Sequence, residues 1–225
     1  MLKTIARILT PKSGEIYINE KNIKEQGAKE LAKVMAVLPQ SPQAPNGLTV
    51  EELIAYGRFP HQKGFGKLKK EDKNIIQWAL EVTGLIEFRE RDIEDLSGGQ
   101  RQRAWIAMAL AQQTDILILD EPTTYLDLAH QLEILNLLKE LNEKHGTTIV
   151  MVIHELNNAA RFADYMIGMK AGKIACQGTA YEVMTKENLK ALFNIDAEII
   201  EDPRNKRPVC VTYDTVSYTH LTLPT

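Results

Sequence analysis

A short polar motif at the head of a helix is the first feature of this chain that could do chemistry. The motif is Leu96-Ser97-Gly98-Gly99-Gln100. Ser97 and Gln100 fit a capping box, and two glycines inside such a box expose backbone N–H groups at the helix N-terminus. The helix macrodipole favours an anion there, so the motif predicts a site for a γ-phosphate. A capping box by itself is common, and its ordinary role is only to begin a helix.

Two adjacent carboxylates follow an apolar run about one helix length after that motif. The apolar run is 116–119, which is typical of a buried strand, and Asp120 and Glu121 come directly after it. Ligands of open α/β folds bind at the carboxyl edge of the sheet, which is where Asp120 is then expected. Its carboxylate suits Mg²⁺, and Glu121 could orient or deprotonate an attacking water. Taken alone, the run fits any buried strand that leaves a sheet.

Two more polar residues follow strand-like runs. Residues 34–39 lead to Gln40, and the β-rich run 147–153 leads to His154. Each has an ordinary interpretation when taken singly: a polar loop residue for Gln40, and a satisfied histidine at a strand end for His154. The neighbouring motifs favour a functional role for His154, and the helical segment that follows Gln40 favours one for that residue.

In these motifs, residues 1 to about 214 resemble the ATPase subunits of ABC transporters. The residues that match are Gln40 (Q-loop glutamine), Leu96, Ser97, Gly98, Gly99 and Gln100 (signature motif), Asp120 (Walker B aspartate), Glu121 (catalytic glutamate), Asp127 (D-loop aspartate) and His154 (switch histidine). These motifs also stand in the order of the family, which leaves little room for chance.

The resemblance implies a fold, a site and partners. The fold is α/β of the P-loop NTPase type: a mainly parallel sheet flanked by helices, with an inserted helical subdomain at 41–96. ATP and Mg²⁺ are the implied cofactors, with Asp120 and Gln40 at the metal and Glu121, His154 and Gln40 in catalysis. Each ATP is expected between two copies of the subunit, where the signature motif of one copy completes the site of the other. The implied location is the cytoplasmic face of the cell membrane, where the subunit contacts membrane permease subunits. A substrate-binding protein is expected to deliver the substrate to that permease.

Two segments indicate a branch within this family. The first is 44–61, and the second is 121–127, in which Tyr125 replaces the small residue of most relatives. Both resemble the importers of ferric siderophores, haem and cobalamin, and the ferric siderophore branch is the closest likeness. The resemblance therefore implies that ATP hydrolysis energises uptake of an iron(III)-siderophore or a related metal chelate. Nothing in an ATPase subunit touches the cargo itself.

Composition and charge narrow the class of protein. The 225 residues, 44% of them hydrophobic, suffice for one domain or for one domain with a small inserted subdomain. No apolar run approaches the roughly 18 residues of a membrane span, and 1–9 predicts an amphipathic helix rather than a signal peptide. The net charge of −3 argues against a nucleic-acid partner. Cys176 and Cys210 lack metal-site spacing and are interpreted as ordinary cytosolic thiols.

The remaining pattern predicts the elements that position these residues. A strand is predicted at 15–19, capping boxes at Thr49 with Glu52 and at Thr179 with Glu182, and a solvated basic loop at 63–70. Strands at 165–169 and 173–177, with a helix from Thr179, are expected to complete the α/β core. The predicted apolar stripes are Ile75, Trp78, Ala79 and Val82 before Gly84, and Leu128, Leu132, Leu135, Leu138 and Leu141 before Gly146.

The phosphate loop of the family, G-x-x-x-x-G-K-[ST], does not occur in this sequence. Residues 1–3 resemble the helix that follows that loop, so the chain is expected to be an N-terminal truncation that lacks about forty residues. The strand before the loop is expected to flank 116–119, and its loss is expected to leave 116–119 with unpaired edges, an aggregating chain and no ATPase activity in isolation. Residues 216–225 correspond to translated sequencing adapter, and we expect the genuine protein to end near Asp214.

Two other interpretations stay open at this point. The chain could be an inert partner subunit that starts naturally at Met1 and offers its signature to a complete subunit. It could also be an ABC ATPase of chromosome maintenance or DNA repair. Such proteins carry a long coiled coil between Q-loop and signature, whereas the interval from Gln40 to Leu96 has no sustained heptads, and the acidic charge disfavours DNA.

Overall fold

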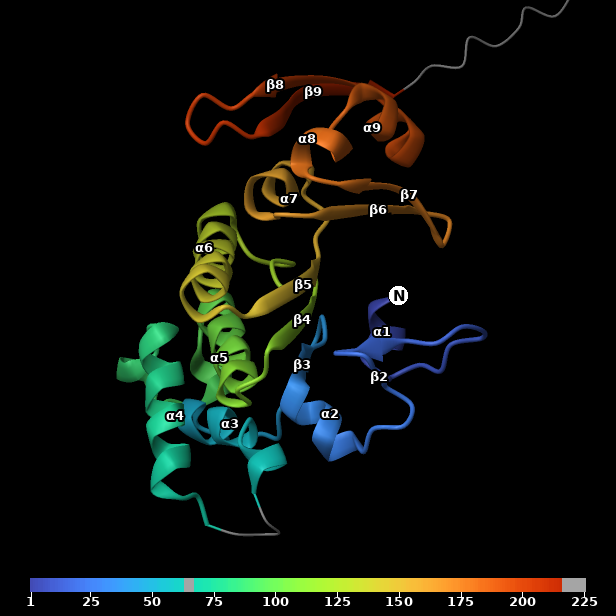
Figure 1. Cartoon of the computed structure of the whole chain (residues 1–225). Helices are drawn as coiled ribbons and strands as arrows, with labels where there is room; N and C mark the ends of the chain where they lie inside the picture. The colour runs from blue at the N-terminus through green and yellow to red at the C-terminus, as the bar shows by residue number, and fades with distance from the viewer. Residues whose placement is uncertain (63–66, 216–225) are drawn as a thin grey trace, which may run out of the picture. The chain divides into compact units, whose positions relative to one another are not determined.

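The computed structural model describes residues 1–62 and 67–215. These residues form two compact units, of which the first is Met1–Val152 and the second begins at Ile153 (Figure 1). The predicted adapter segment 216–225 and half of the predicted basic loop, 63–66, lie outside the described residues.

A parallel sheet of three strands forms the centre of the first unit (Figure 1). Its strands are β3 (Met35–Leu38), β4 (Ile116–Asp120) and β5 (Thr148–Val152), in the spatial order β3-β4-β5. In register, Leu38 pairs with Leu119, and Asp120 pairs with Val152. Because all three strands run the same way, their carboxyl ends meet at one edge, as the sequence predicts for a ligand site.

The central place of β4 corrects one expectation from the sequence. Residues 116–119 were expected to have an unpaired edge, yet the whole segment pairs with β3 on one side and with β5 on the other. The prediction is wrong because the chain itself supplies both neighbours of β4. The edge strands of this sheet are β3 and β5, so the expected aggregation through an open β4 loses its physical basis.

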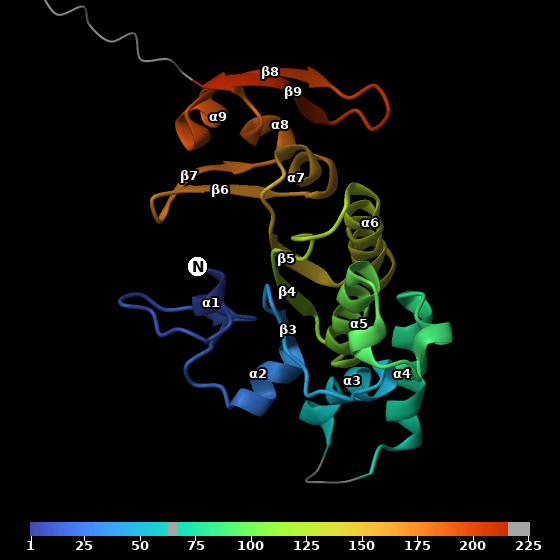
Figure 2. The same cartoon turned by 180° about the vertical axis from the view of Figure 1, so that it is seen from behind.

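The interval 41–96 is mainly helical, as predicted, and packs with the sheet into one core. Its elements are α3 (Val50–Tyr56), η1 (Phe59–His61), α4 (Lys70–Val82), η2 (Ile86–Phe88) and η3 (Ile93–Asp95). The Thr49 capping box is confirmed: Thr49 Oγ1 accepts from Glu52 N at 3.3 Å, and Glu52 Oε2 accepts from Thr49 N at 2.9 Å. Figure 2 shows α3 and α4 beside α5 (Gly98–Ala111), with which they share a buried cluster.

The predicted stripes are confirmed in part. On α4, Ala79 is fully buried and Ile75, Trp78 and Val82 pack on the same core, although Ile76 and Leu80 are the deeper positions. The helix α6 (Leu128–His145) buries Leu135, Leu138 and Leu141 and ends at Gly146, whose φ is +67°. Leu128 is 68% exposed, so the stripe prediction is wrong there. Leu128 is the first helical residue, and the buried positions begin only at Ile134.

The N-terminal segment is less helical than predicted. The helix α1 (Leu2–Ile5) covers only part of 1–9, and Arg7 has a left-handed φ of +58°, which no α-helix contains. The strand predicted at 15–19 is a short hairpin of β1 (Tyr17–Ile18) and β2 (Lys21–Asn22). It is followed by α2 (Ala28–Val34), which leads directly into β3.

The second unit is built from two antiparallel hairpins and three helices among its described residues. Its elements are α7 (Leu156–Phe162), β6 (Met166–Lys170), β7 (Lys173–Gly178), α8 (Ala180–Val183), α9 (Lys186–Phe193), β8 (Ile195–Glu201) and β9 (Pro208–Thr215). The strands predicted at 165–169 and 173–177 exist, but they pair with each other and do not join the parallel sheet. The capping box of Thr179 and Glu182 is confirmed, and the β8–β9 hairpin was not predicted.

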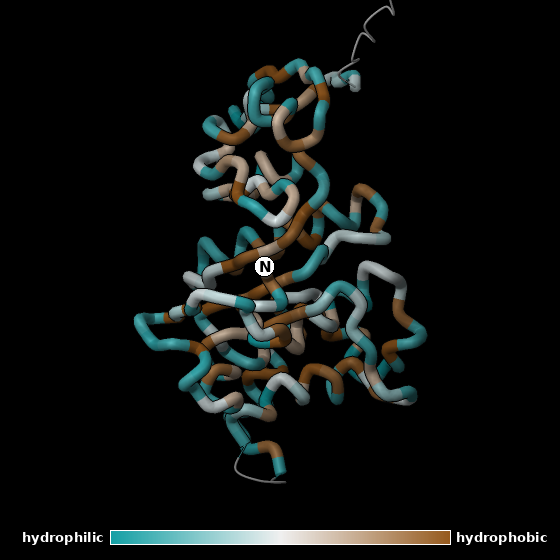
Figure 3. Tube along the Cα trace, turned by 90° about the vertical axis from the view of Figure 1, so that its right-hand side faces the viewer, coloured by the Kyte–Doolittle hydropathy of each residue, from teal (hydrophilic) through white to brown (hydrophobic). Residues whose placement is uncertain are grey.

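Apolar and hydrophilic stretches alternate along the trace in both units (Figure 3), and the buried residues gather in separate clusters of each unit. None of the helices in the described ranges combines the length and the apolar character that a membrane span requires.

Candidate functional site

The carboxyl edge of the parallel sheet brings a glutamine and a carboxylate together. Asp120 is the last residue of β4 and is half-buried, and Glu121 follows it. Gln40 lies two residues beyond the end of β3. Its Nε2 donates a hydrogen bond of 2.5 Å to Glu121 Oε2, across 81 positions of sequence. Polar residues that the sequence places after two different strands therefore meet at one edge.

Glu121 adopts an unusual backbone conformation at this edge. Its φ is +54°, in the left-handed region that residues other than glycine rarely adopt. Such a conformation costs about 1–3 kcal/mol and persists where neighbouring contacts enforce it. The Glu121 carboxylate accepts hydrogen bonds from Gln40 and from Thr124 Oγ1, the latter at 2.9 Å. Strained residues of this kind gather at functional sites, so the backbone points to the same position as the carboxylate.

The donor atoms at this edge fit a hard divalent cation. Asp120 offers a carboxylate, and the side-chain amide of Gln40 has a carbonyl oxygen besides the nitrogen that donates to Glu121. Mg²⁺ prefers oxygen and is usually bound through one or two carboxylates together with the phosphates of its substrate. Among the described residues, no three His, Cys, Asp or Glu side chains form a metal-binding group. A phosphate substrate would supply further oxygen ligands to an ion at this edge.

The signature motif opens α5 as predicted. Ser97 is the N-cap, its Oγ accepts from Gln100 N at 3.3 Å, and Gln100 Oε1 accepts from Ser97 N at 3.0 Å. Leu96 is buried in the core, whereas Ser97 and Gly98 are exposed. The first turn of a helix has backbone N–H groups without intrahelical partners, so this exposed turn offers donors to an anion.

A residue that the sequence reasoning missed joins the signature to the D-loop. A Cβ at Gly99 would lie 2.5 Å from His130 Cδ2, so the imidazole lies directly against Gly99 and leaves room only for glycine. His130 Nδ1 is 2.8 Å from Asp127 Oδ1, which also accepts from His130 N at 3.0 Å. The hydrogen bond from His130 N, and next that from its ring, hold the pKa of Asp127 below its ordinary value. The D-x-x-H spacing at a helix start is the signal that could have found this contact.

His154 lies in the second unit, exposed and two residues before α7. The helix α7 is fixed to β9 by Asn157, whose Oδ1 accepts from Cys210 N at 2.8 Å and whose Nδ2 donates to Cys210 O at 3.0 Å. The residues that meet in the first unit are Gln40, Asp120 and Glu121 at the sheet edge, and Gly99, Asp127 and His130 at the signature. The role of His154 stays a prediction from the sequence.

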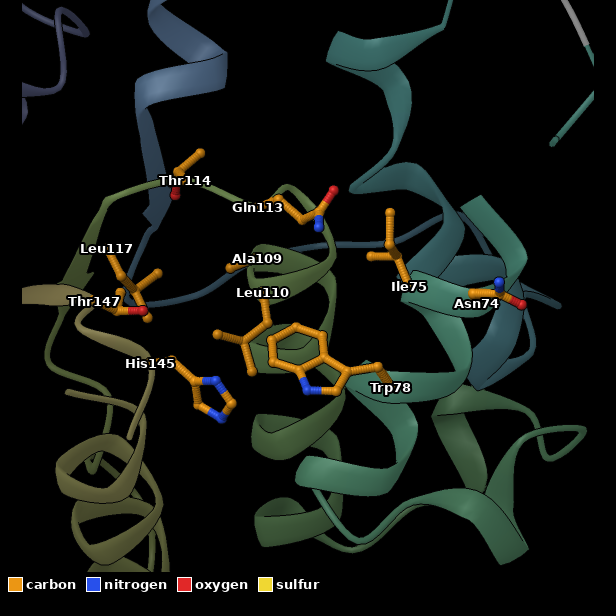
Figure 4. A pocket seen from close by; sticks show the side chains of 10 residues that line it. All are labelled: Asn74, Ile75, Trp78, Ala109, Leu110, Gln113, Thr114, Leu117, His145 and Thr147. Carbon is orange, nitrogen blue, oxygen red and sulfur yellow. The ribbon is translucent and has the colours of Figure 1, made fainter. Parts of the chain in front are cut away.

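A pocket of about 350 Å³ lies at the opposite end of the strands, near the beginning of β4 and β5 (Figure 4). Its walls are mainly apolar, and the ring of Trp78 meets that of His145 edge-on, with centroids 5.5 Å apart. Its lining contains no lysine or arginine, so it does not suit a triphosphate. The lining residues are Asn74, Ile75, Trp78, Ala109, Leu110, Gln113, Thr114, Leu117, His145 and Thr147.

Comparison with known sequences agrees with the motifs. The model of the ABC transporter family matches residues 1–124. The iron(3+)-hydroxamate import ATP-binding protein FhuC of Bacillus subtilis strain 168 is 62% identical over 216 residues, which cover 96% of this chain and 80% of that protein. The petrobactin import ATP-binding protein FpuD of Bacillus anthracis is 47% identical over 95% of this chain and 78% of that protein.

Solved structures show the same fold. An inward-facing metal-chelate type ABC transporter has a chain that is 28% identical, with a TM-score of 0.79 over 93% of this chain and 80% of that chain. A dimeric ATP-binding cassette bound to ADP and phosphate is 31% identical, with a TM-score of 0.67 over 79% and 78%. The predicted α/β fold of the P-loop NTPase type is confirmed. This chain belongs to the ABC transporter family, in which it matches the ATP-binding ATPase subunits.

Proposed function

We propose that this chain is the ATP-binding and hydrolysing subunit of an importer for iron(III) hydroxamate or a closely related ferric siderophore. The observation that carries the proposal is the 62% identity to the hydroxamate import protein of Bacillus subtilis over 96% of this chain. The lower identity of 47% to the petrobactin import protein supports the wider siderophore class and favours a hydroxamate within it. Import, rather than DNA repair or an inert role, is the function that these relatives support.

The proposed subunit works with a second copy of itself and with membrane permease subunits at the cytoplasmic face of the membrane. A substrate-binding protein supplies the ferric chelate to the permease. The helical region 41–96 of the proposed ATPase domain 1–214 carries exposed aromatic residues, Tyr56 at 52% and Phe59 at 65%. Aromatic side chains are favoured at protein interfaces, which supports this region, next to Gln40, as the surface that the permease grips.

The proposed chemistry is positioning and charge neutralisation at the carboxyl edge of the sheet. Asp120 and Gln40 would hold Mg²⁺, which would neutralise charge on the phosphate oxygens. Glu121 orients the attacking water and accepts its proton, and the Gln40 contact holds that carboxylate in place. A role for His154 in the same reaction is also proposed, from its match to the switch histidine of the family.

The other half of the site comes from the second copy in this proposal. Ser97, Gly98, Gly99 and Gln100 begin α5, where free amides and the helix dipole favour the γ-phosphate. Leu96, which is buried, anchors this turn to the core. Two copies then enclose two ATP molecules, and closing and reopening of the dimer drives the permease. The D-loop residue Asp127 stays next to the signature through His130.

Deletion of the gene tests the proposed cargo. A strain without the gene should lose growth on a ferric hydroxamate as sole iron source. The wild-type gene should restore growth, and a gene with Glu121→Gln should not, because the importer would then lack its source of energy. Growth on an excess of inorganic iron is the control and should be unaffected. Unimpaired uptake of the ferric hydroxamate, with loss of a sugar or amino-acid uptake instead, would refute the proposal.

A further inference from the structure

A buried arginine holds the end of α5 that lies away from the signature motif. Arg58 stands between α3 and η1 and is 5% exposed. Its Nε donates to Asp72 Oδ1 on α4 at 2.9 Å. Its Nη1 donates to Ala111 O, the last carbonyl of α5, at 2.7 Å and to Gln113 Oε1 at 2.9 Å. One guanidinium therefore joins three segments of the first unit.

These contacts satisfy the carbonyl groups that end α5. The last carbonyls of a helix have no intrahelical partner, and a positive charge is favoured beside them. Besides the Arg58 bond to Ala111 O, His61 Nε2 lies 2.7 Å from Gln112 O. Gln112 Nε2 in turn donates to Met35 O at 3.2 Å, at the start of β3. The C-terminal end of α5 is thus tied to the helical region and to the sheet.

The Arg58–Asp72 pair is charged although both side chains are nearly buried, with 6% and 10% exposed. Burial by itself would raise the pKa of Asp72. The hydrogen bonds from Arg58 and from Lys69 N outweigh this effect and hold the pKa of Asp72 below its ordinary value. Since an unpaired buried charge is unfavourable, neither side chain leaves the pair easily.

The backbone next to Arg58 lies against α5 without a gap. A Cβ at Gly57 would lie 2.1 Å from Met108 O and 3.0 Å from Ala111 Cβ, so the end of α3 contacts the last turn of α5 directly. Tyr56 and Phe59 flank this contact in sequence and are exposed. The buried contacts of Arg58 with α5 are therefore adjacent in sequence to the exposed aromatic side chains of Tyr56 and Phe59.

We propose that Arg58 is a positioning residue for ATP hydrolysis, which locks α5 to α3 and α4 so that a movement of Tyr56 and Phe59 moves the signature motif. The proposal rests on the proposed function, because it treats these aromatics as the surface that the permease grips. The helix α5 has 14 residues and is therefore about 20 Å long. A slight tilt at the clamped end displaces the amides of Gly98 and Gly99, and a misplacement of about 1 Å can lower a rate about 10²-fold.

The test removes the tie to α5 without leaving a buried charge. The double variant Arg58→Met with Asp72→Leu replaces the ion pair by apolar side chains, a change that buried pairs often tolerate. The matched control is Arg89→Met. Arg89 also joins α3 to α4, through Glu51 at 2.7 Å and Gln77 at 3.3 Å, but these bonds do not go to α5. The variants are made in the full-length protein and assembled with its permease subunits in lipid vesicles.

Phosphate release is measured against ATP concentration, together with ferric hydroxamate uptake and the melting temperature. We expect kcat and uptake of the double variant to fall about tenfold and KM for ATP to change less, because the amides of the signature motif are displaced whereas Asp120 and Gln40 at the sheet edge stay in place. The Arg89→Met control should keep wild-type kcat. A double variant with wild-type kcat, whether or not its melting temperature falls, would overturn the proposal.

A conservative variant keeps the test decisive if the double variant does not fold. Arg58→Lys retains a charge beside Asp72, but a lysine ammonium lacks the planar fork whose Nε reaches Asp72 while its Nη1 reaches Ala111 O and Gln113 Oε1. It should fold and still lose kcat, and normal kcat in this variant would also overturn the role. If the proposed function is wrong, a different result is expected: the wild-type protein hydrolyses ATP but transports no ferric hydroxamate. In that case kcat alone tests the positioning role of Arg58.

Discussion

The two ends of α5 are built in opposite ways. At its N-terminal end Ser97 and Gly98 are exposed, and the hydrogen bonds of the cap stay within the motif itself. At its C-terminal end Ala111 is fully buried, and its carbonyl accepts from an arginine 53 positions away. In the proposed function, the open end presents its amides to a phosphate of a second copy, and the contacts of the closed end hold the helix in place.

The largest effect on kcat is expected from a substitution of Glu121, the proposed base on which the signature end of α5 depends for hydrolysis. The variant Glu121→Gln keeps the shape of the side chain but removes the base, so kcat should fall about 10²- to 10⁴-fold while ATP still binds. ATP-bound dimers should accumulate because closure no longer leads to hydrolysis. Phosphate release and size-exclusion chromatography with ATP measure both effects. Glu143→Gln, an exposed change on α6, is the control, and similar turnover in the two variants would contradict the assignment of Glu121.

A smaller effect is expected where the open end meets His130. In Gly99→Ala the new Cβ would lie 2.5 Å from His130 Cδ2, so either the first turn of α5 or the His130 side chain must shift. A shift of about 1 Å in a group that binds the phosphate should lower kcat about 10²-fold. The double variant Gly99→Ala with His130→Ala removes the clash and should recover part of kcat, which steady-state kinetics measures. Without any recovery, the contact with His130 is not the cause of the loss.

The charged Asp72 carboxylate at the closed end should make the stability of the protein depend on pH in the acid range. The pKa of Asp72 in the folded protein lies below its ordinary value of 3.8. Its contribution to stability is therefore complete above about pH 4 and is lost as the pH falls through the lower folded pKa. Thermal melts between pH 6 and pH 2.5 should show the wild type and Asp72→Asn converging at the acid end. A constant difference in melting temperature across this range would show that the charge of Asp72 does not contribute to the stability of the fold.

Local features of the fold were predictable from the sequence because they depend on a few neighbouring residues. The capping box of Thr49 and Glu52, the box of Ser97 and Gln100, and the left-handed Gly146 all follow from spacing alone, and the structure has them. The strands that end before Gln40 and at Asp120 follow from apolar runs, and the parallel pairing then brings Gln40 to Glu121.

The features that were missed depend on residues far apart in the sequence. Nothing in 116–119 shows that both of its neighbours lie within this chain, and the contact of Gly99 with His130 needs the packing of two helices. Arg58 belongs to a segment that was noted only for its resemblance to siderophore importers. Its burial against the end of α5 has no local signal, because its partners lie 14 to 55 positions away.

We propose that the exposed signature end of α5 acts on the nucleotide of a second copy. The direct measurement is phosphate release by two covalently linked dimers of the full-length protein, each with one Glu121→Gln and one Gly98→Asp substitution. An aspartate at position 98 suits the helix dipole but repels a phosphate. When the substitutions lie on different copies, one composite site stays intact and hydrolysis should continue. When both lie on the same copy, each site is damaged and hydrolysis should stop; the reverse pattern would contradict the claim.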